Sequence, residues 1–106
     1  MINFEELLSE YRLHPEFLGI EILDVNQKGA LDSTLLHIAA RTGRLEHIRI
    51  LVAAGACIDA RGDLGNTPLH EAALCGAADA VDVLLSLGAD AKLLNEFNQT
   101  AFKMAG

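Results

Sequence analysis

The chain has 106 residues, of which 51% are hydrophobic, and it carries a formal net charge of −7 with a pI of about 4.9. This length suits a single domain, and the mean hydropathy of +0.27 argues against a disordered chain. The acidic balance argues against binding to nucleic acid, because phosphates attract cationic proteins. It favours a partner protein with a basic surface.

The compartment is indicated by the cysteines and by the first residues of the chain. Cys57 and Cys75 are too few for a disulfide framework, so we expect buried free thiols in a reducing environment. The acidic start lacks the layout of a signal peptide, and no apolar run is long enough to cross a membrane. We therefore expect a cytoplasmic protein without a membrane role, with export lacking a cleaved signal as the alternative.

Residues 1–26 predict two helices, near residues 4–11 and 14–23. Pro15 suits the first turn of the second helix, where its missing N–H costs nothing. The outer face is charged because it carries Glu5, Glu6, Glu10, Glu16 and Glu21. Such a face suits the end unit of a stack, which no neighbour covers. An N-terminal arm unrelated to the rest of the chain is the alternative.

Residues 27–33 predict a projecting turn, and two helices are expected after it, over residues 34–41 and 45–53. Thr34 suits the N-cap of the first helix, and Gly43 and Gly55 suit the positions just after the two helices. In the second helix the apolar residues expected to face inward are Leu45, Ile48, Leu51 and Val52.

The pattern that begins at Thr34 returns at Thr67. We expect helices over residues 68–75 and 78–87, ended by Gly76 and Gly88. In the second of these helices the residues expected to be buried are Val81, Leu84 and Leu85. After the same interval, Thr100 begins another copy. A period of about 33 residues is typical of stacked repeats.

The last copy is incomplete, with a turn and one short helix over residues 101–105. Lys103 stands where the earlier copies have His, and Ala101 stands where Pro68 stands one copy earlier, so we expect a weaker helix start. Since a second helix is missing, part of the preceding apolar face lacks cover. Three explanations remain open: a fragment of a longer array, a minimal cap, or a face covered by a partner.

The core sequence Thr67-Pro68-Leu69-His70-Glu71-Ala72 resembles the ankyrin-repeat family, and the resemblance covers essentially the whole chain. It implies an all-α ankyrin-repeat solenoid of stacked helix-turn-helix units with short β-hairpin-like fingers. The implied units are residues 1–26 (degenerate), 27–59, 60–92 and 93–106 (partial). The resemblance also implies that His37 and His70 have a structural role, bonding the backbone of neighbouring turns.

Three apolar residues recur with the period of the repeat at the expected finger tips: Leu31, Leu64 and Phe97. Each stands beside a residue type that tolerates positive φ, namely Asp32, Gly65 and Asn98. Exposed together, they would form an apolar stripe of the kind that marks a contact surface. The alternative is that neighbouring fingers pack these side chains against each other. Leu94 would extend the stripe.

The resemblance further marks positions that line the concave groove and contact a partner. In this chain they are Lys28, Ser33, Arg41, Thr42, Arg61, Asp63, Asn66, Leu74, Cys75, Glu96 and Gln99. Mixed charges around an apolar centre are typical of an interface with anchors and a polar rim. Because the array is short, we expect a footprint of at most about 800 Å².

No pattern in the sequence indicates catalysis. There is no nucleophile elbow, phosphate loop or paired-carboxylate motif, and no Cys or His spacing typical of zinc sites. We therefore expect a protein that is not an enzyme and that needs no cofactor and no metal. His14 and His47 are expected to be partly exposed, and Cys57 is expected to be a packing residue.

These patterns predict a module that binds another protein through the groove and finger tips, as an adaptor or an inhibitor of a basic protein. We expect a monomer or a weak homodimer. Two alternatives remain. The first is a structural protein that self-associates through the uncovered C-terminal helix face. The second is a metal or redox module built on His37, His70 and Cys75.

Overall fold

The computed structural model describes residues 2–105, with side chains as far as residue 103. The α-helices in this part of the chain are α1 (Phe4–Arg12), α2 (Leu35–Arg41), α3 (Leu45–Ala53), α4 (Pro68–Leu74), α5 (Ala78–Ser86) and α6 (Ala101–Ala105). Two short 3-10 turns, η1 (Pro15–Phe17) and η2 (Asp63–Gly65), accompany them. Six predicted helices therefore form, each within one residue of the predicted bounds.

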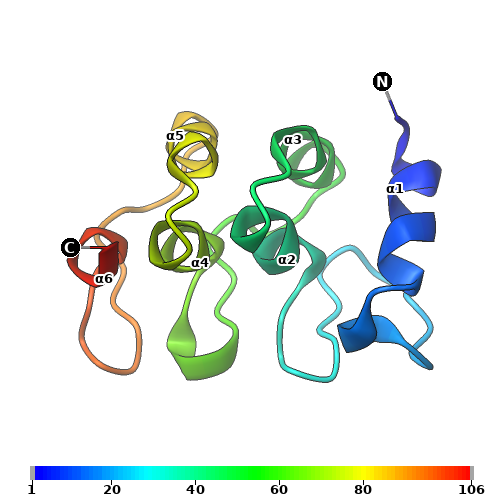
Figure 1. The fold of residues 1–106 in the computed structure, drawn as a ribbon, viewed down its shortest axis with the longest axis horizontal. Coiled ribbons are helices and arrows are strands. Elements are labelled where there is room, and N and C mark those ends of the chain that lie inside the picture. The colour runs from blue at the N-terminus through cyan, green and yellow to red at the C-terminus, as the bar shows by residue number, and fades with distance from the viewer. Residues whose placement is uncertain (1, 106) are drawn as a thin grey trace.

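The helices stand in two rows, and each helix pair leans on the next (Figure 1). One row consists of α2, α4 and α6, and the other consists of α3 and α5. Across the rows, α2 packs on α3 and α4 packs on α5. Three loops project from the side away from α3 and α5 (Figure 1). This regular translation of one helix pair onto the next confirms the predicted all-α solenoid.

The N-terminal unit departs from the pattern. α1 is seen from the side where the other helices are seen nearly end-on, so it lies across the end of the stack (Figure 1). It packs on α3 and buries Leu7, Leu8 and Tyr11. The helix predicted over residues 14–23 does not form. Pro15 starts only the single turn η1, because Leu18 is extended and Gly19 has a φ of +78°.

A hydrogen-bonded cap recurs at the start of α2 and α4 and ties neighbouring units together. In α2, Thr34 Oγ1 accepts the His37 backbone N–H at 3.3 Å, and His37 Nδ1 accepts the Thr34 N–H at 3.2 Å. The other ring nitrogen of His37 donates to the Asn66 carbonyl, one loop further on, at 2.8 Å. Thr67 and His70 repeat the arrangement in α4. The structural role implied for the two histidines is therefore confirmed.

The projecting loops are tight turns, and no strand forms within residues 2–105. The two ends of each loop are joined by a backbone hydrogen bond of 2.8–3.0 Å, from Gly29 to Ser33, Gly62 to Asn66 and Asn95 to Gln99. We call the loops finger 1 (residues 29–33), finger 2 (residues 62–66) and finger 3 (residues 95–99). Positive φ was predicted near each tip, and it occurs at Asp32 (69°), Gly65 (72°) and Asn98 (56°).

The core between the rows is apolar and closely packed. Ile48, Leu51 and Leu84 have no solvent exposure, as predicted. Val81 and Leu85, which were predicted to be buried, are only partly buried, and Ala80 and Val83 of α5 are buried instead. For Val81 the difference arises because no helix within residues 2–105 follows α5 in its row, whereas Leu85 resembles its equivalent Val52, which is also partly buried.

Candidate functional site

The apolar side chains at the finger tips lie in solvent. Leu31, Leu64 and Phe97 keep 69%, 46% and 62% of their surface exposed, and Leu94 keeps 45%. All four are exposed, and Leu31 and Phe97 keep more than half of their surface in solvent. We call these four side chains the finger-tip stripe. All of them belong to loops on one side of the molecule, below α2, α4 and α6 (Figure 1).

Leu64 occupies its place in finger 2 with a strained backbone. Its φ is +59°, in the left-handed region that Gly, Asn and Asp adopt more readily. For a residue with a Cβ this conformation costs roughly 1–2 kcal/mol. Strain of this kind, maintained at an exposed apolar residue, points to a functional position.

Fingers 2 and 3 are fixed to each other by polar contacts. The Glu96 N–H donates to the Leu64 carbonyl at 2.9 Å. The Arg61 guanidinium donates to the Leu94 carbonyl at 2.5 Å and to the Gly65 carbonyl at 3.3 Å. A Cβ on Gly65 would lie 3.0 Å from the Glu96 nitrogen, so a side chain there would require the two backbones to move apart by a few tenths of an ångström. The spacing of the two tips is therefore set before any partner arrives.

Arg41 on α2 joins finger 1 to α4. Its guanidinium donates to Ser33 Oγ at 2.8 Å, and its Nε lies 3.6 Å from a carboxylate oxygen of Glu71. The Ser33 N–H in turn donates to Glu16 Oε2 at 2.7 Å. Burial raises the pKa of Glu71, and the Arg41 cation opposes that rise. Arg41 is therefore held by contacts within the molecule, and its positive charge partly neutralises the Glu71 carboxylate in the groove.

The exposed charges beside the stripe are mostly acidic, and Arg61 is an exposed cation among them whose guanidinium bonds backbone carbonyls. Lys28 lies 3.4 Å from the Asp32 carboxylate within finger 1. Asp63 and Glu96 are exposed, and neither forms an ion pair among the side chains described. Each of these two carboxylates stands next to a stripe residue in the sequence. A partner would therefore meet an apolar stripe flanked by unpaired negative charge.

Two of the residues predicted to contact a partner are buried. Ser33 and Asn66 are 3% and 5% exposed. Ser33 is held by Glu16, and Asn66 Oδ1 accepts from Asn95 Nδ2 at 3.0 Å, so both fix the fingers. We therefore leave them out of the contact surface. Gln99 is half-buried, whereas the groove-facing ends of α2 and α4 expose Thr42, Leu74 and Cys75.

Further expectations about single residues were wrong for Cys57 and His47. Both thiols are exposed, although Cys57 was expected to pack. The exposure of Cys75 agrees with its expected position in the groove and not with the general expectation of buried thiols. Cys57 lies in the loop after α3, where its backbone N–H donates to Asn26 Oδ1 at 2.7 Å. His47 was expected to be partly exposed but is 3% exposed, because α1 covers it.

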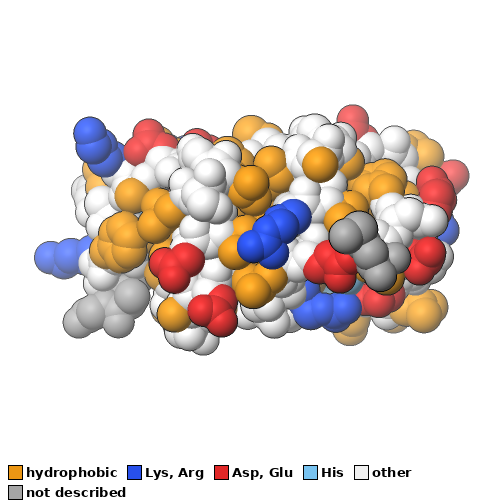
Figure 2. All heavy atoms as spheres, turned by 90° about the horizontal axis from the view of Figure 1, so that it is seen from above, with side chains coloured by type: hydrophobic (Ala, Val, Ile, Leu, Met, Phe, Trp, Pro, Cys, Tyr) orange, Lys and Arg blue, Asp and Glu red, His pale blue; other side chains and the backbone are white. Residues whose placement is uncertain are grey.

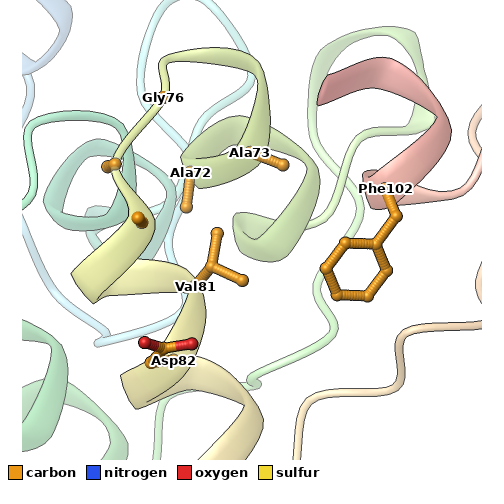
Figure 3. A pocket seen from close by; sticks show the side chains of 8 residues that line it. Ala72, Ala73, Gly76, Val81, Asp82 and Phe102 are labelled. Atoms are coloured by element: carbon orange, nitrogen blue, oxygen red, sulfur yellow. The ribbon is translucent and has the colours of Figure 1, made fainter. Parts of the chain in front are cut away.

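One exposed aromatic residue escaped the sequence analysis. Phe102 on α6 is 53% exposed, whereas Leu69, its equivalent in the preceding unit, is 1% exposed. The ring lies across an apolar hollow from Val81 of α5 (Figure 3). The repeat pattern would place Phe102 in the core, and only the arrangement of α5 and α6 reveals that nothing described here covers it.

The geometry gives no support to a metal or redox module. Both ring nitrogens of His37 and of His70 are engaged in the caps. Within the described residues, no three His, Cys, Asp or Glu side chains gather so as to hold a metal ion. None of the helices in this part of the chain combines the length and the apolarity needed to cross a bilayer.

Comparison with known proteins agrees with the repeat geometry. A family model described as ankyrin repeats, in three copies, matches residues 6–95. No curated protein matches the chain in a sequence comparison. The division into units at residues 26, 59 and 92 stays a prediction. Because the family model spans most of the sequence, the chain belongs to the ankyrin-repeat family, whose members are typically non-enzymatic modules that bind other proteins.

Proposed function

We propose that this protein binds a partner protein through the finger-tip stripe and the adjacent groove, and that the partner's surface is basic around an apolar patch. The observation that carries the proposal is the exposure of the four apolar side chains of the finger-tip stripe, close in the sequence to the unpaired carboxylates of Asp63 and Glu96. Exposed apolar patches with a polar rim typically mark contact surfaces. The sign of the charge would steer a basic partner to the stripe.

Rigid fingers support this assignment. Binding pays for the ordering of loops and side chains, and a surface that is ordered beforehand avoids much of that loss. The bonds from Arg61 and Glu96 hold fingers 2 and 3 together, and the His37 bond holds finger 2 to α2. We expect such a module to act as an adaptor or an inhibitor in the cytoplasm.

The experiment compares two double variants that are matched in chemistry. A partner isolated from the native source on the immobilised protein is titrated against wild type, against Leu64→Ser/Phe97→Ser, and against Leu13→Ser/Leu23→Ser. Leu13 and Leu23 are 76% and 77% exposed but lie outside the stripe. We expect the stripe variant to bind at least about tenfold more weakly, because exposed apolar anchors carry much of the binding energy.

The control variant is expected to bind like wild type. A second arm replaces Asp63 and Glu96 with lysine, and we expect slower association and a weaker dependence on salt. Full affinity in the stripe variant, or an equal loss in both double variants, would refute the assignment of the binding surface. Unchanged kinetics in the lysine variant would refute the basic partner.

A further inference from the structure

A second unpartnered surface lies at the α5–α6 end of the molecule, away from the fingers. A hollow of about 230 Å³ opens there between α4, α5 and α6, with Ala72 and Val81 on one side and Phe102 on the other (Figure 3). An apolar cavity of roughly 150 Å³ admits a molecule as large as benzene. The hollow therefore has room for at least one large aliphatic side chain.

The preceding unit shows what kind of element covers this face. Ile48 on α3 is the equivalent of Val81 one repeat earlier, and it is completely buried because α5 packs on α3. Val81 is only partly buried, since residues 2–105 supply no helix beyond α5 in that row. The packing of α5 on α3 therefore serves as a template for what could bind in the hollow. By this template, the bound element would be a helix that packs on α5 as α5 packs on α3.

The template also indicates which side chains the occupant presents. His47 on α3 contacts Tyr11 of α1, the element that precedes it, at 3.0 Å. Ala80 is the equivalent of His47, so we infer that Ala80 and Val83, both buried, face α3. The occupant would accordingly offer a small residue and a branched apolar residue three positions apart, on one face of a helix.

The charged side chains around the hollow indicate which kind of partner could bind in it. Asp82 lines the hollow, Asp79 is exposed one turn away, and neither forms an ion pair among the side chains described. Seen from above the α3–α5 row, apolar side chains gather at the α5 end, with acidic side chains beside them and basic side chains at the left edge (Figure 2). Two copies paired symmetrically with α5 against α5 would bring Asp79 and Asp82 of both copies together. A helix with a basic residue beside its apolar stripe is the complementary partner.

We propose that the α5–α6 face docks one amphipathic helix of a partner protein, with its apolar stripe in the hollow and a lysine or arginine opposite Asp82. This surface is separate from the finger-tip stripe, so the molecule can hold one protein on its fingers and a helix on its end. Such an arrangement suits an adaptor that brings two partners together.

The test uses two synthetic peptides built on the template. Both carry the sequence of residues 77–88 with capped ends. The acidic peptide keeps Asp79 and Asp82, and the basic peptide has lysine at both positions. Binding to the full chain is measured by calorimetry at low ionic strength, with helix formation followed by circular dichroism. We expect the basic peptide to bind about tenfold more tightly, because a repulsive charge pair is replaced by an attractive one.

Variants of the protein locate the binding. Val81→Lys is expected to abolish binding of the basic peptide by placing a charge in the hollow. Asp82→Lys, an exposed change that leaves the core intact, is expected to shift the preference to the acidic peptide. Glu5→Lys, which makes the same change in net charge on exposed α1, is expected to leave both affinities unchanged. The Leu64→Ser/Phe97→Ser variant is expected to bind the peptides like wild type, so the two surfaces are tested separately.

Three results would overturn the proposal. One is equal affinity for the two peptides. Another is binding that survives both Val81→Lys and Asp82→Lys. The third is a dimer, detected by light scattering over a dilution series, that Val81→Lys dissociates, since this would assign the face to a second copy of the chain.

Discussion

His47 links the first helix to the repeats, and its surroundings hold it neutral. Its Nε2 accepts from the Arg44 guanidinium at 3.1 Å, so Nδ1 carries the proton and donates to the Tyr11 hydroxyl at 3.0 Å. Burial lowers the pKa of His47, the Arg44 cation lowers it further, and Glu10 and Glu46 oppose this effect. A second proton would break the contact with Arg44, so acid weakens the joint between α1 and α3.

We expect the stability of the protein to fall below about pH 6.5, and His47 to cause part of that fall. Because its pKa is lower in the folded chain than in the unfolded chain, the unfolded state binds the proton first as the pH drops. Between pH 7.5 and 5.5 this contributes at most about 1.4 kcal/mol per histidine. Urea unfolding at the two pH values measures the loss, and His47→Gln is expected to reduce it.

His14→Gln is the matched control, because the His14 ring accepts the Glu16 N–H, whereas Tyr11 and Arg44 bond the ring of His47. Burial also lowers the pKa of His37, so the His47→Gln variant is expected to keep part of the pH dependence. An identical loss of stability in wild type and both variants would show that His47 plays no part.

The strained leucine of finger 2 gives a second prediction. Leu64→Asn is expected to raise stability by about 1 kcal/mol, since asparagine adopts positive φ more readily. The same change is expected to weaken partner binding, because it removes a stripe residue. Thermal unfolding measures the first effect and titration with the partner the second. Leu31→Asn, at an exposed position without positive φ, is expected to change stability by less than about 0.5 kcal/mol. Equal changes in stability in the two variants would contradict the claim that the backbone of Leu64 is strained.

At the scale of elements, the energetic contribution of the contact between fingers 2 and 3 can be measured by comparing substitutions at two glycines with similar backbone conformations. Gly65 and Gly76 have φ values of +72° and +70°, but a Cβ on Gly65 would lie 3.0 Å from Glu96 N, whereas a Cβ on Gly76 meets nothing within 4 Å. Alanine at either position is expected to lose roughly 1–2 kcal/mol from the left-handed backbone. Gly65→Ala is expected to lose more, because fingers 2 and 3 must separate. Chemical denaturation measures both, and equal losses would mean that the fingers do not support each other.

The elements of the repeats could be predicted because local signals and the period agree. Thr67 and Pro68 start α4 where a cap and a first-turn proline belong, and Gly76 follows its end. The helix expected over residues 14–23 failed because the period was extended into a stretch where Gly19 adopts positive φ. No local signal opposed the expectation strongly enough, since Pro15 is equally suited to a full helix and to a single turn.

The candidate site was predictable in position but not in exposure. Spacing alone placed Leu31, Leu64 and Phe97 at the tips, whereas the strain at Leu64 depends on the particular turn of finger 2. The burial of Asn66 arises from a contact with Asn95 in the next loop, which only the stacked units create. The exposure of Phe102 was missed, whereas the incomplete cover of the face that carries Val81 follows from the missing second helix of the last copy.

At the scale of the whole molecule, stability is expected to decrease toward α6. In a stack of this kind each unit is stabilised by its neighbours, and α6 packs mainly on α4. We expect the amides of α6 to exchange with solvent first and those of α2 to α5 last. Native-state hydrogen exchange measures this order. Slower exchange in α6 than in α3 would contradict it.

Because α1 lies across the end of the stack, the two ends of the molecule differ in whether another repeat could pack on them. A helix that lies across the stack, with its outer surface charged, offers nothing on which another helix pair could continue the series. The opposite end presents an apolar hollow between α4, α5 and α6, at the position where α5 covers the preceding unit. Anyone lengthening this protein by design would therefore add new units after α6 and leave the N-terminal end untouched.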